Sequence, residues 1–190
     1  MSGKIEWEKI CNEVQDRVWE ATPKTEESAK QLKAKILKCL TSASNDKVLK
    51  TKIFEIHDLL KLAKAEKHGK NVWEIAGGQR NFKRRKEIPH FERWDGCWFD
   101  FAILIEEASK KSAEAIAFNF EIRFPENDSV NFLRFDLNLP HHNNEMRGMR
   151  FHIHPGSDDL MIPSPPLSPL EILHLFLYSL PVPQRPRSSS

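Results

Sequence analysis

The hydrophobic period of the chain changes near Cys97, and this change limits the folds that the chain can adopt. Before Cys97, apolar residues recur at steps of three and four, the spacing of amphipathic helices. After it, apolar and polar residues alternate, as they do in strands that bury one face. We therefore predict an α+β protein with an N-terminal three-helix segment, an antiparallel meander of about four strands and a C-terminal helix.

Three stretches of the first third carry a helical apolar stripe. The stripes are Trp7, Ile10, Cys11, Val14 and Val18; Ala29, Leu32, Ile36, Leu37 and Leu40; and Leu49, Ile53, Ile56, Leu60 and Ala63. We expect the second helix to begin at Thr22-Pro23 and the third at Ser44-Asn45-Asp46, because Pro suits a first turn and Ser, Asn and Asp cap helices. Ser168 and Glu171 have the spacing of a capping box, which predicts the start of the closing helix.

The alternating half of the chain contains four predicted strands. They lie within residues 97–105, 116–124, 131–139 and 149–154. Together with the helices they divide the chain into a helical segment (1–69), a basic joint (70–96), a sheet with its closing helix (97–180) and a disordered tail (181–190). The tail is short, polar and proline-rich, a composition that does not form a core.

Charge and cysteine content exclude several classes of protein. The net charge is +2, but residues 1–90 carry 20 Lys and Arg against 13 Asp and Glu, whereas residues 91–190 carry 9 against 14. This asymmetry indicates two parts with different roles or two parts that attract each other. The absence of an apolar run of about 18 residues predicts no membrane partner. Cys11, Cys39 and Cys97 lie far apart, which argues against a disulfide framework and favours the cytoplasm.

The polar faces of the last two predicted strands form the best candidate site. The pleat places Arg134 and Asp136 on one face of residues 132–139, and Arg150, His152 and His154 on one face of residues 149–154. His141 and His142 lie in the loop between the strands and are candidates for substrate binding. The alternative is that the face is structural, because an exposed sheet face is polar and Arg–Asp pairs stabilise sheets.

This set of residue types is sufficient for metal-free cleavage of RNA. His152 and His154 would act as acid and base near neutral pH, Arg134 and Arg150 would stabilise phosphate, and Asp136 would orient a histidine. Such a scheme needs no cofactor. In the alternative, His152 and His154 would hold zinc, with Asp158 as a further ligand.

A basic cluster in the joint is the second candidate for contact with RNA. It consists of Arg80, Lys83, Arg84, Arg85 and Lys86, and it surrounds Phe82. Cations interleaved with an aromatic residue are typical of surfaces that bind the phosphate backbone. The alternative is a solvated joint between two parts of the chain.

Residues 132–156 resemble the hallmark of the TumE-like toxins of bacterial toxin–antitoxin pairs. Those proteins carry an Arg-aromatic-Asp-Asn strand, a following His-His pair, and a histidine pair on the next strand. Arg134, Phe135 and Asp136 match here, His141-His142 and the histidines of the next strand fall in the corresponding places, and the Asn is displaced to Asn138. The resemblance implies a small toxin that acts on RNA and is held by a cognate antitoxin.

The segment HIHPG followed by PS is also similar to the HxHP…SxxD signature of the JAMM metalloproteases. Those enzymes hold zinc with two His, an Asp and a water. The residue three positions after Ser164 is Leu167 rather than Asp, and Glu106 or Glu107 would have to serve as the upstream glutamate. This resemblance implies a zinc hydrolase.

We therefore expect a toxin-like endoribonuclease that uses the His, Arg and Asp side chains of the sheet face. The main alternative is a non-catalytic adaptor or inhibitor in a bacterial defence or toxin–antitoxin assembly, whose helices and tryptophans bind a protein partner. A zinc hydrolase of JAMM-like type is the third possibility.

Overall fold

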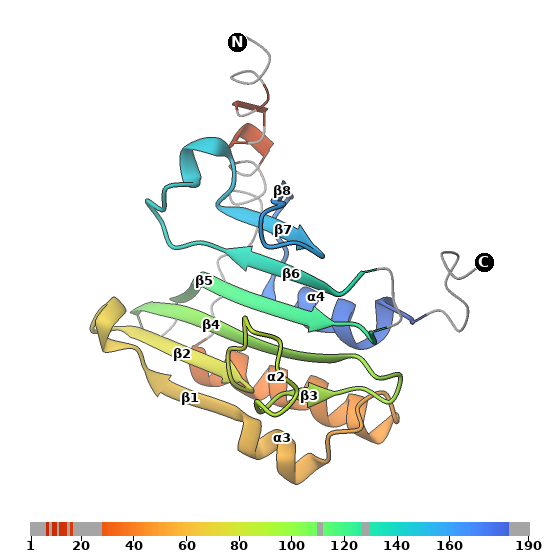
Figure 1. The fold of residues 1–190 in the computed structure, drawn as a ribbon. Helices are drawn as coiled ribbons and strands as arrows, with labels where there is room; N and C mark the ends of the chain where they lie inside the picture. The colour runs from red at the N-terminus through yellow and green to blue at the C-terminus, as the bar shows by residue number, and fades with distance from the viewer. Residues whose placement is uncertain are drawn as a thin grey trace, which may run out of the picture.

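In the computed structural model, the described residues are 28–109, 112–126 and 130–182, together with 7, 9, 10, 12–14 and 16. Eight strands of this part of the chain form one antiparallel sheet in the order β1-β2-β4-β5-β6-β7-β8, and β3 pairs with β4 (Figure 1). Their bounds are β1 (Leu60–Lys64), β2 (Val72–Gly77), β3 (Phe91–Glu92), β4 (Trp98–Ser109), β5 (Ser112–Arg123), β6 (Phe132–Leu137), β7 (Phe151–Pro155) and β8 (Ile162–Pro163).

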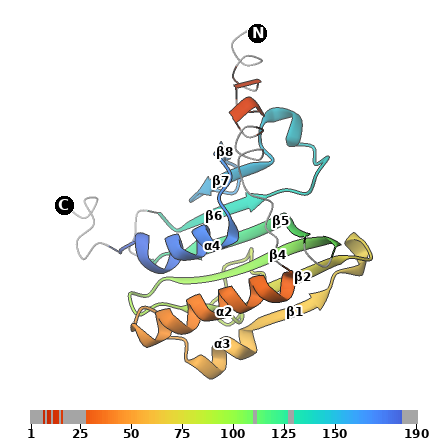
Figure 2. The ribbon, with the colours of Figure 1, turned by 180° about the vertical axis from the view of Figure 1, so that it is seen from behind.

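Helices cover one face of the sheet. They are α2 (Ala29–Asn45), α3 (Ile53–Leu59) and α4 (Pro169–His174), which continues as a π-helical turn over Leu175–Ser179. Figure 2 shows α2 and α4 lying across this face. Short 3₁₀ turns occupy Glu66–His68 (η1) and Glu145–Arg147 (η2). The α+β prediction is confirmed, but the sheet is larger than the predicted four strands. Among the described residues, none of the helices combines the length and the apolar character that a membrane-spanning segment requires.

The predicted third helix is wrong at both ends. Ser44-Asn45-Asp46, expected to cap its start, lies at the end of α2 instead, and α3 begins only at Ile53, behind Lys52. It ends at Leu59, and the chain continues as β1, where Leu60 pairs with Gly77 and Lys64 with Trp73. Leu60 and Ala63 have helical spacing, but pairing with β2 places them in a strand. Tertiary contacts of this kind outweigh the local preference of a short segment for helix. β1, β2 and β3 thus lie in the ranges expected to hold only a helical segment and a basic joint.

The other helix predictions have mixed outcomes. α2 begins at Ala29 behind a capping box formed by Ser28 and Gln31, and the expected start at Thr22-Pro23 lies outside the described residues. The described residues between 7 and 16 are helical, with Trp7 and Ile10 exposed. The capping box of Ser168 and Glu171 is confirmed at the start of α4. Residues 183–190 of the expected tail lie outside the described part.

The core lies between the helices and the apolar face of the sheet. It is dominated by packed aromatic rings, which are Phe91, Phe99, Phe101, Phe118, Phe120, Phe135, Phe151 and Phe176. Phe101 and Phe120 stack across β4 and β5 with ring centroids 4.9 Å apart. The alternation predicted for residues 116–124 and 131–139 directs Phe118, Phe120 and Phe135 inward, and it leaves the opposite face of the same strands polar.

A loop crosses the polar face. This loop, residues 79–89, is called the strap here; its ends are joined by a hydrogen bond from Gln79 N to Pro89 O of 2.8 Å. In Figure 1 it lies in front of the sheet, on the side away from α2 and α4. Asn81, a residue of the strap itself, is buried, and its carbonyl accepts a hydrogen bond from Arg123 of β5. The strap therefore covers part of a face that the sequence alone suggests is open to solvent.

Candidate functional site

The register of the sheet brings the predicted polar residues together. β6 and β7 pair so that Arg134 lies opposite His154 and Asp136 opposite His152. The antiparallel pairing predicted for residues 132–139 and 149–154 is therefore confirmed. On the other side of β6, Glu121 of β5 lies opposite Arg134. Strand pairing thus gathers these side chains on one face of the sheet.

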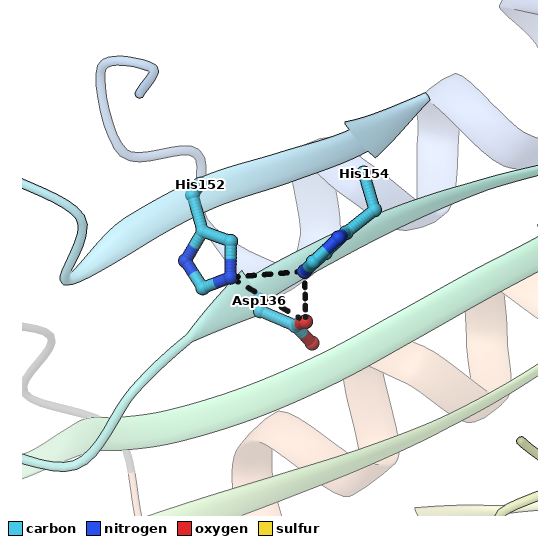
Figure 3. Close-up of side chains that lie close together, drawn as sticks. All are labelled: Asp136, His152 and His154. Atoms are coloured by element: carbon cyan, nitrogen blue, oxygen red, sulfur yellow. Dashed lines mark hydrogen bonds and ion pairs between the residues drawn. The ribbon is translucent and has the colours of Figure 1, made fainter. Parts of the chain in front are cut away.

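Asp136, His152 and His154 form a compact triad. Figure 3 shows the three side chains pointing toward one another from β6 and β7. Nε2 of His152 lies 3.1 Å from Nε2 of His154. Oδ2 of Asp136 lies 3.4 Å from Nε2 of His154 and 3.8 Å from Nε2 of His152. Three potential ligand atoms therefore face a common point.

The remaining ring nitrogens, the two Nδ1 atoms, both lie next to backbone carbonyl oxygens. Nδ1 of His152 lies 2.9 Å from the carbonyl oxygen of Met149, and Nδ1 of His154 lies 3.3 Å from that of Ser157. A carbonyl oxygen can only accept a hydrogen bond, so each Nδ1 carries a hydrogen. In the neutral rings, each Nε2 then presents a lone pair to the centre of the triad.

Asp136 is held by neighbours on both of its oxygens. Arg134 Nε donates to Oδ2 at 2.9 Å, and the Asn119 side chain donates to Oδ1. Burial pushes the pKa of Asp136 up, but the contacts with His154, Arg134 and Asn119 outweigh burial, and the pKa is lowered below its usual value. Asp136 is therefore a carboxylate at neutral pH.

The two histidines are almost inaccessible to solvent. His152 is 3% exposed and His154 is 4% exposed. Burial is the main cause that lowers the pKa of His152, and the neighbouring His154 lowers it further against the effect of Asp136. His152 is consequently neutral at neutral pH, with its Nε2 lone pair available.

A charged network continues from the triad toward the strap. Arg134 contacts Asp136, Glu121 and Asp158, and Arg84 of the strap donates to Glu121 at 3.0 Å and to Asp158 at 2.8 Å. Asp158, the expected further zinc ligand, is thus paired with two arginines. These hydrogen bonds lower the pKa of Asp158 to about 2. The carboxylate that completes the triad is Asp136.

The other predicted site residues lie outside this cluster. Arg150 precedes β7, and its Nε is 3.5 Å from the carbonyl oxygen of Asn138. His141 is 96% exposed and pairs with Glu145, and His142 is also exposed. Glu107, considered as a JAMM-like glutamate, instead accepts hydrogen bonds from Trp73 and from the N-terminus of α2. The exposed cations of the predicted basic cluster, which are Arg80, Lys83, Arg85 and Lys86, lie on the strap or at its start.

Sequence reasoning missed that β4 and β5 belong to the same polar network. Glu121 is 1% exposed and is contacted by three arginines, and Asp100 is 1% exposed and paired with Arg123. The available signal was the alternation of residues 116–124, which places Asn119, Glu121 and Arg123 on the face away from the core. The side chains that these three residues contact can be identified only once the order of the strands in the sheet is known.

The buried carboxyl of Asp100 should make the free energy of unfolding depend on pH. Burial raises its pKa to about 6 against the effect of Arg123. Because this pKa lies above the unfolded value, the stabilisation from its proton is fully present below about pH 4 and is lost as the pH rises through about 6. Between pH 5 and pH 7.5, the wild type should therefore lose about 1 kcal/mol of its free energy of unfolding relative to Asp100→Asn, which cannot titrate at this position. Urea unfolding of both proteins at the two pH values measures this difference, and a constant difference would contradict the prediction.

Comparisons with known proteins assign no family to the chain. No protein-family model, no curated protein and no solved structure matches it. A function for this chain therefore has to be derived from the geometry and chemistry of its own residues.

Proposed function

We propose that the protein binds one divalent transition-metal ion between Asp136, His152 and His154. The observation that carries the proposal is the convergence of two imidazole Nε2 atoms and one carboxylate oxygen within 3.8 Å of one another. Two His and one carboxylate are a ligand set used for iron and zinc. The triad supplies three ligands, and water or a substrate atom would complete the coordination.

The distances within the triad support an ion of this size. A circle through three atoms separated by 3.1, 3.4 and 3.8 Å has a radius of about 2.0 Å. This radius equals the usual length of a bond from zinc to an imidazole nitrogen or a carboxylate oxygen, about 2.0–2.2 Å. The three side chains would therefore need little movement to bind the ion.

The outer contacts of the triad also suit a metal. Histidines that bind metals usually donate their second ring N–H to a carbonyl or carboxylate, and ligating carboxylates are themselves hydrogen-bonded. Met149 and Ser157 provide the carbonyls, and Arg134 and Asn119 hold Asp136. When both rings are neutral and no cation is bound, two lone pairs face each other at 3.1 Å in a buried site, which is unfavourable.

The burial of the triad favours metal binding over the acid–base scheme for RNA cleavage. That scheme requires a phosphate to reach His152 and His154, which are 3% and 4% exposed. It also requires Arg134 to bind phosphate, although Arg134 already contacts three carboxylates. RNA cleavage therefore remains a prediction from the sequence.

Titration of the metal-free protein tests the proposal directly. The protein is treated with a chelator and then titrated with Zn²⁺ by calorimetry and with Co²⁺ by absorption spectroscopy. We expect one ion per chain and Co²⁺ d–d bands typical of nitrogen and oxygen ligands. His152→Ala with His154→Ala should weaken binding by at least about 100-fold, because changes outside the ligand shell alone cost 10- to 100-fold.

His141→Ala with His142→Ala is the matched control, since it removes two exposed histidines from the adjoining loop. This control should bind the ion as the wild type does. The wild type failing to bind either ion at millimolar concentration would exclude the metal. Equal loss of binding in the control would place the ion on surface histidines instead. Circular dichroism shows whether each variant is folded, and His154→Gln replaces the double variant if it is not.

A further inference from the structure

We propose that the strap and the groove beside it bind single-stranded nucleic acid. The inference does not rest on the proposed metal, because it follows from a different set of side chains. The exposed cations are Arg80, Lys83, Arg85 and Lys86. Within the described part of the chain, none of the four is engaged in an ion pair, whereas Arg84 between them is paired with Glu121 and Asp158. The strap therefore presents unneutralised positive charge to solvent.

The strap holds these cations in a fixed arrangement. The Asn81 side chain bonds to both the carbonyl and the amide of Arg85, at 2.6 and 3.1 Å. The guanidinium of Arg84 lies 3.5 Å from the centre of the Phe132 ring. The bonds within the strap hold its shape, and the contacts of Arg84 with Phe132 and Glu121 hold its middle on the sheet. A pre-organised loop loses less conformational entropy when a ligand binds, so its charges are suited to recognition.

Aromatic rings on the same surface distinguish nucleic acid from other polyanions. Phe82 of the strap is 47% exposed, and Arg80 lies over its ring at 4.3 Å. Trp94 is 64% exposed. Proteins that bind single strands combine cations along the phosphate backbone with aromatic faces on which the bases stack. An acidic peptide or an anionic membrane would use the charges but would gain no stacking.

A groove continues from the end of the strap. This cavity of about 1170 Å³ is lined by Lys86 of the strap, by Lys47, Lys50 and Lys52 of the segment between α2 and α3, and by Trp94. Acidic residues line it too, and Lys50 is paired with Glu92 at 3.0 Å. The excess of positive charge therefore lies on the strap, while the groove adds lysines and an indole ring. A nucleic-acid chain held by the strap would enter the groove with its bases toward Trp94.

The strap also lies next to the proposed metal centre. Arg134, which holds Asp136, has its guanidinium 5.5 Å from the centre of the Phe82 ring. A nucleic acid bound by the strap would therefore pass close to the triad. Nucleic acid on this surface would therefore lie near the metal centre, although its binding needs no metal.

Binding of labelled 12-nucleotide probes to the full chain tests the inference. Fluorescence anisotropy compares single-stranded RNA and DNA of one sequence with polyglutamate and with anionic phospholipid vesicles. The two single strands should bind more tightly than polyglutamate and the vesicles. Affinity should fall linearly with salt on a logarithmic scale, as counterions are released.

Two variants separate the roles of charge and stacking. Lys83→Glu with Arg85→Glu should lower affinity at least about 10-fold and reduce the salt slope by about 1.4, the value for two lost contacts on a single strand. Phe82→Ala should lower affinity about 5- to 100-fold without changing the salt slope, because stacking on an aromatic ring is not ionic. The Gln versions of the two cation substitutions replace the charge reversal if that variant does not fold.

Lys30→Glu with Lys38→Glu is the matched control, because both lysines are exposed on α2, on the other face of the sheet. This control changes the net charge equally and should bind as the wild type does. An equal loss of affinity in the control would mean that the overall charge of the protein, and not the strap, determines binding. Polyglutamate or vesicles binding as tightly as RNA, with no effect of Phe82→Ala, would overturn the proposal in favour of an acidic protein or a membrane surface.

Discussion

Replacing Glu121 by alanine should lower the free energy of unfolding by about 3–5 kcal/mol. Glu121 is 1% exposed, and its carboxylate contacts Arg84, Arg123 and Arg134. Removing it leaves Arg123, which is 3% exposed, and Arg134, which is 7% exposed, without their shared carboxylate. Breaking a buried charged network from one side is costly because the remaining charges stay desolvated.

Urea unfolding measures this loss. Glu114→Ala is the matched control, since Glu114 is exposed on the same strand, and its change should stay within about 0.5 kcal/mol. A loss below about 1 kcal/mol for Glu121→Ala would mean that the arginines are satisfied by Asp100, Asp136 and Asp158 alone. In that case Glu121 would not hold the strap on the sheet.

The sheet could be predicted only where the alternation is long. Residues 97–105 and 116–124 each span nine positions of alternation, and β4 and β5 include all of them except Cys97 and Phe124. Residues 60–64, with the sequence LKLAK, fit a helix through Leu60 and Ala63 and a strand through Leu60 and Leu62 equally well. Pairing with β2 decides between the two, and sequence periodicity does not contain that information. β3 and β8 have two residues each, too few for any periodic signal.

The residues of the site could be predicted from the sequence, but their burial could not. The pleat and an antiparallel pairing of the last two predicted strands were sufficient to place His152, His154, Arg134 and Asp136 on one face. Their burial could not be predicted, because it depends on the strap and on the turn after β7, whose Ser157 carbonyl reaches back to His154. Burial changes the chemical interpretation, since buried imidazoles that face each other are suited to an ion rather than to a large substrate.

Zinc should stabilise the protein through the triad. A ligand that binds only the folded state adds about 4 kcal/mol at a free concentration 1,000 times its Kd. For a chain of this length, such a gain corresponds to a rise in Tm of about 8–16 °C. The ion would bridge β6 and β7 by binding Asp136 and the two Nε2 atoms, which are 3.1 Å apart. A chelator in excess should return the Tm to its metal-free value.

Asp136→Asn should lose most of this zinc-dependent rise, because an amide oxygen is a much weaker zinc ligand than a carboxylate. Asp159→Asn is the control, since Asp159 is an exposed carboxylate that follows β7 and lies outside the triad. Thermal unfolding of the three proteins, with and without zinc, separates the effect on the metal from any effect on the fold. Equal zinc-dependent rises in all three would place the ion away from Asp136. A rise in the wild type and in Asp159→Asn alone would identify the Asp136–His152–His154 triad as the site whose occupancy stabilises the end of the sheet.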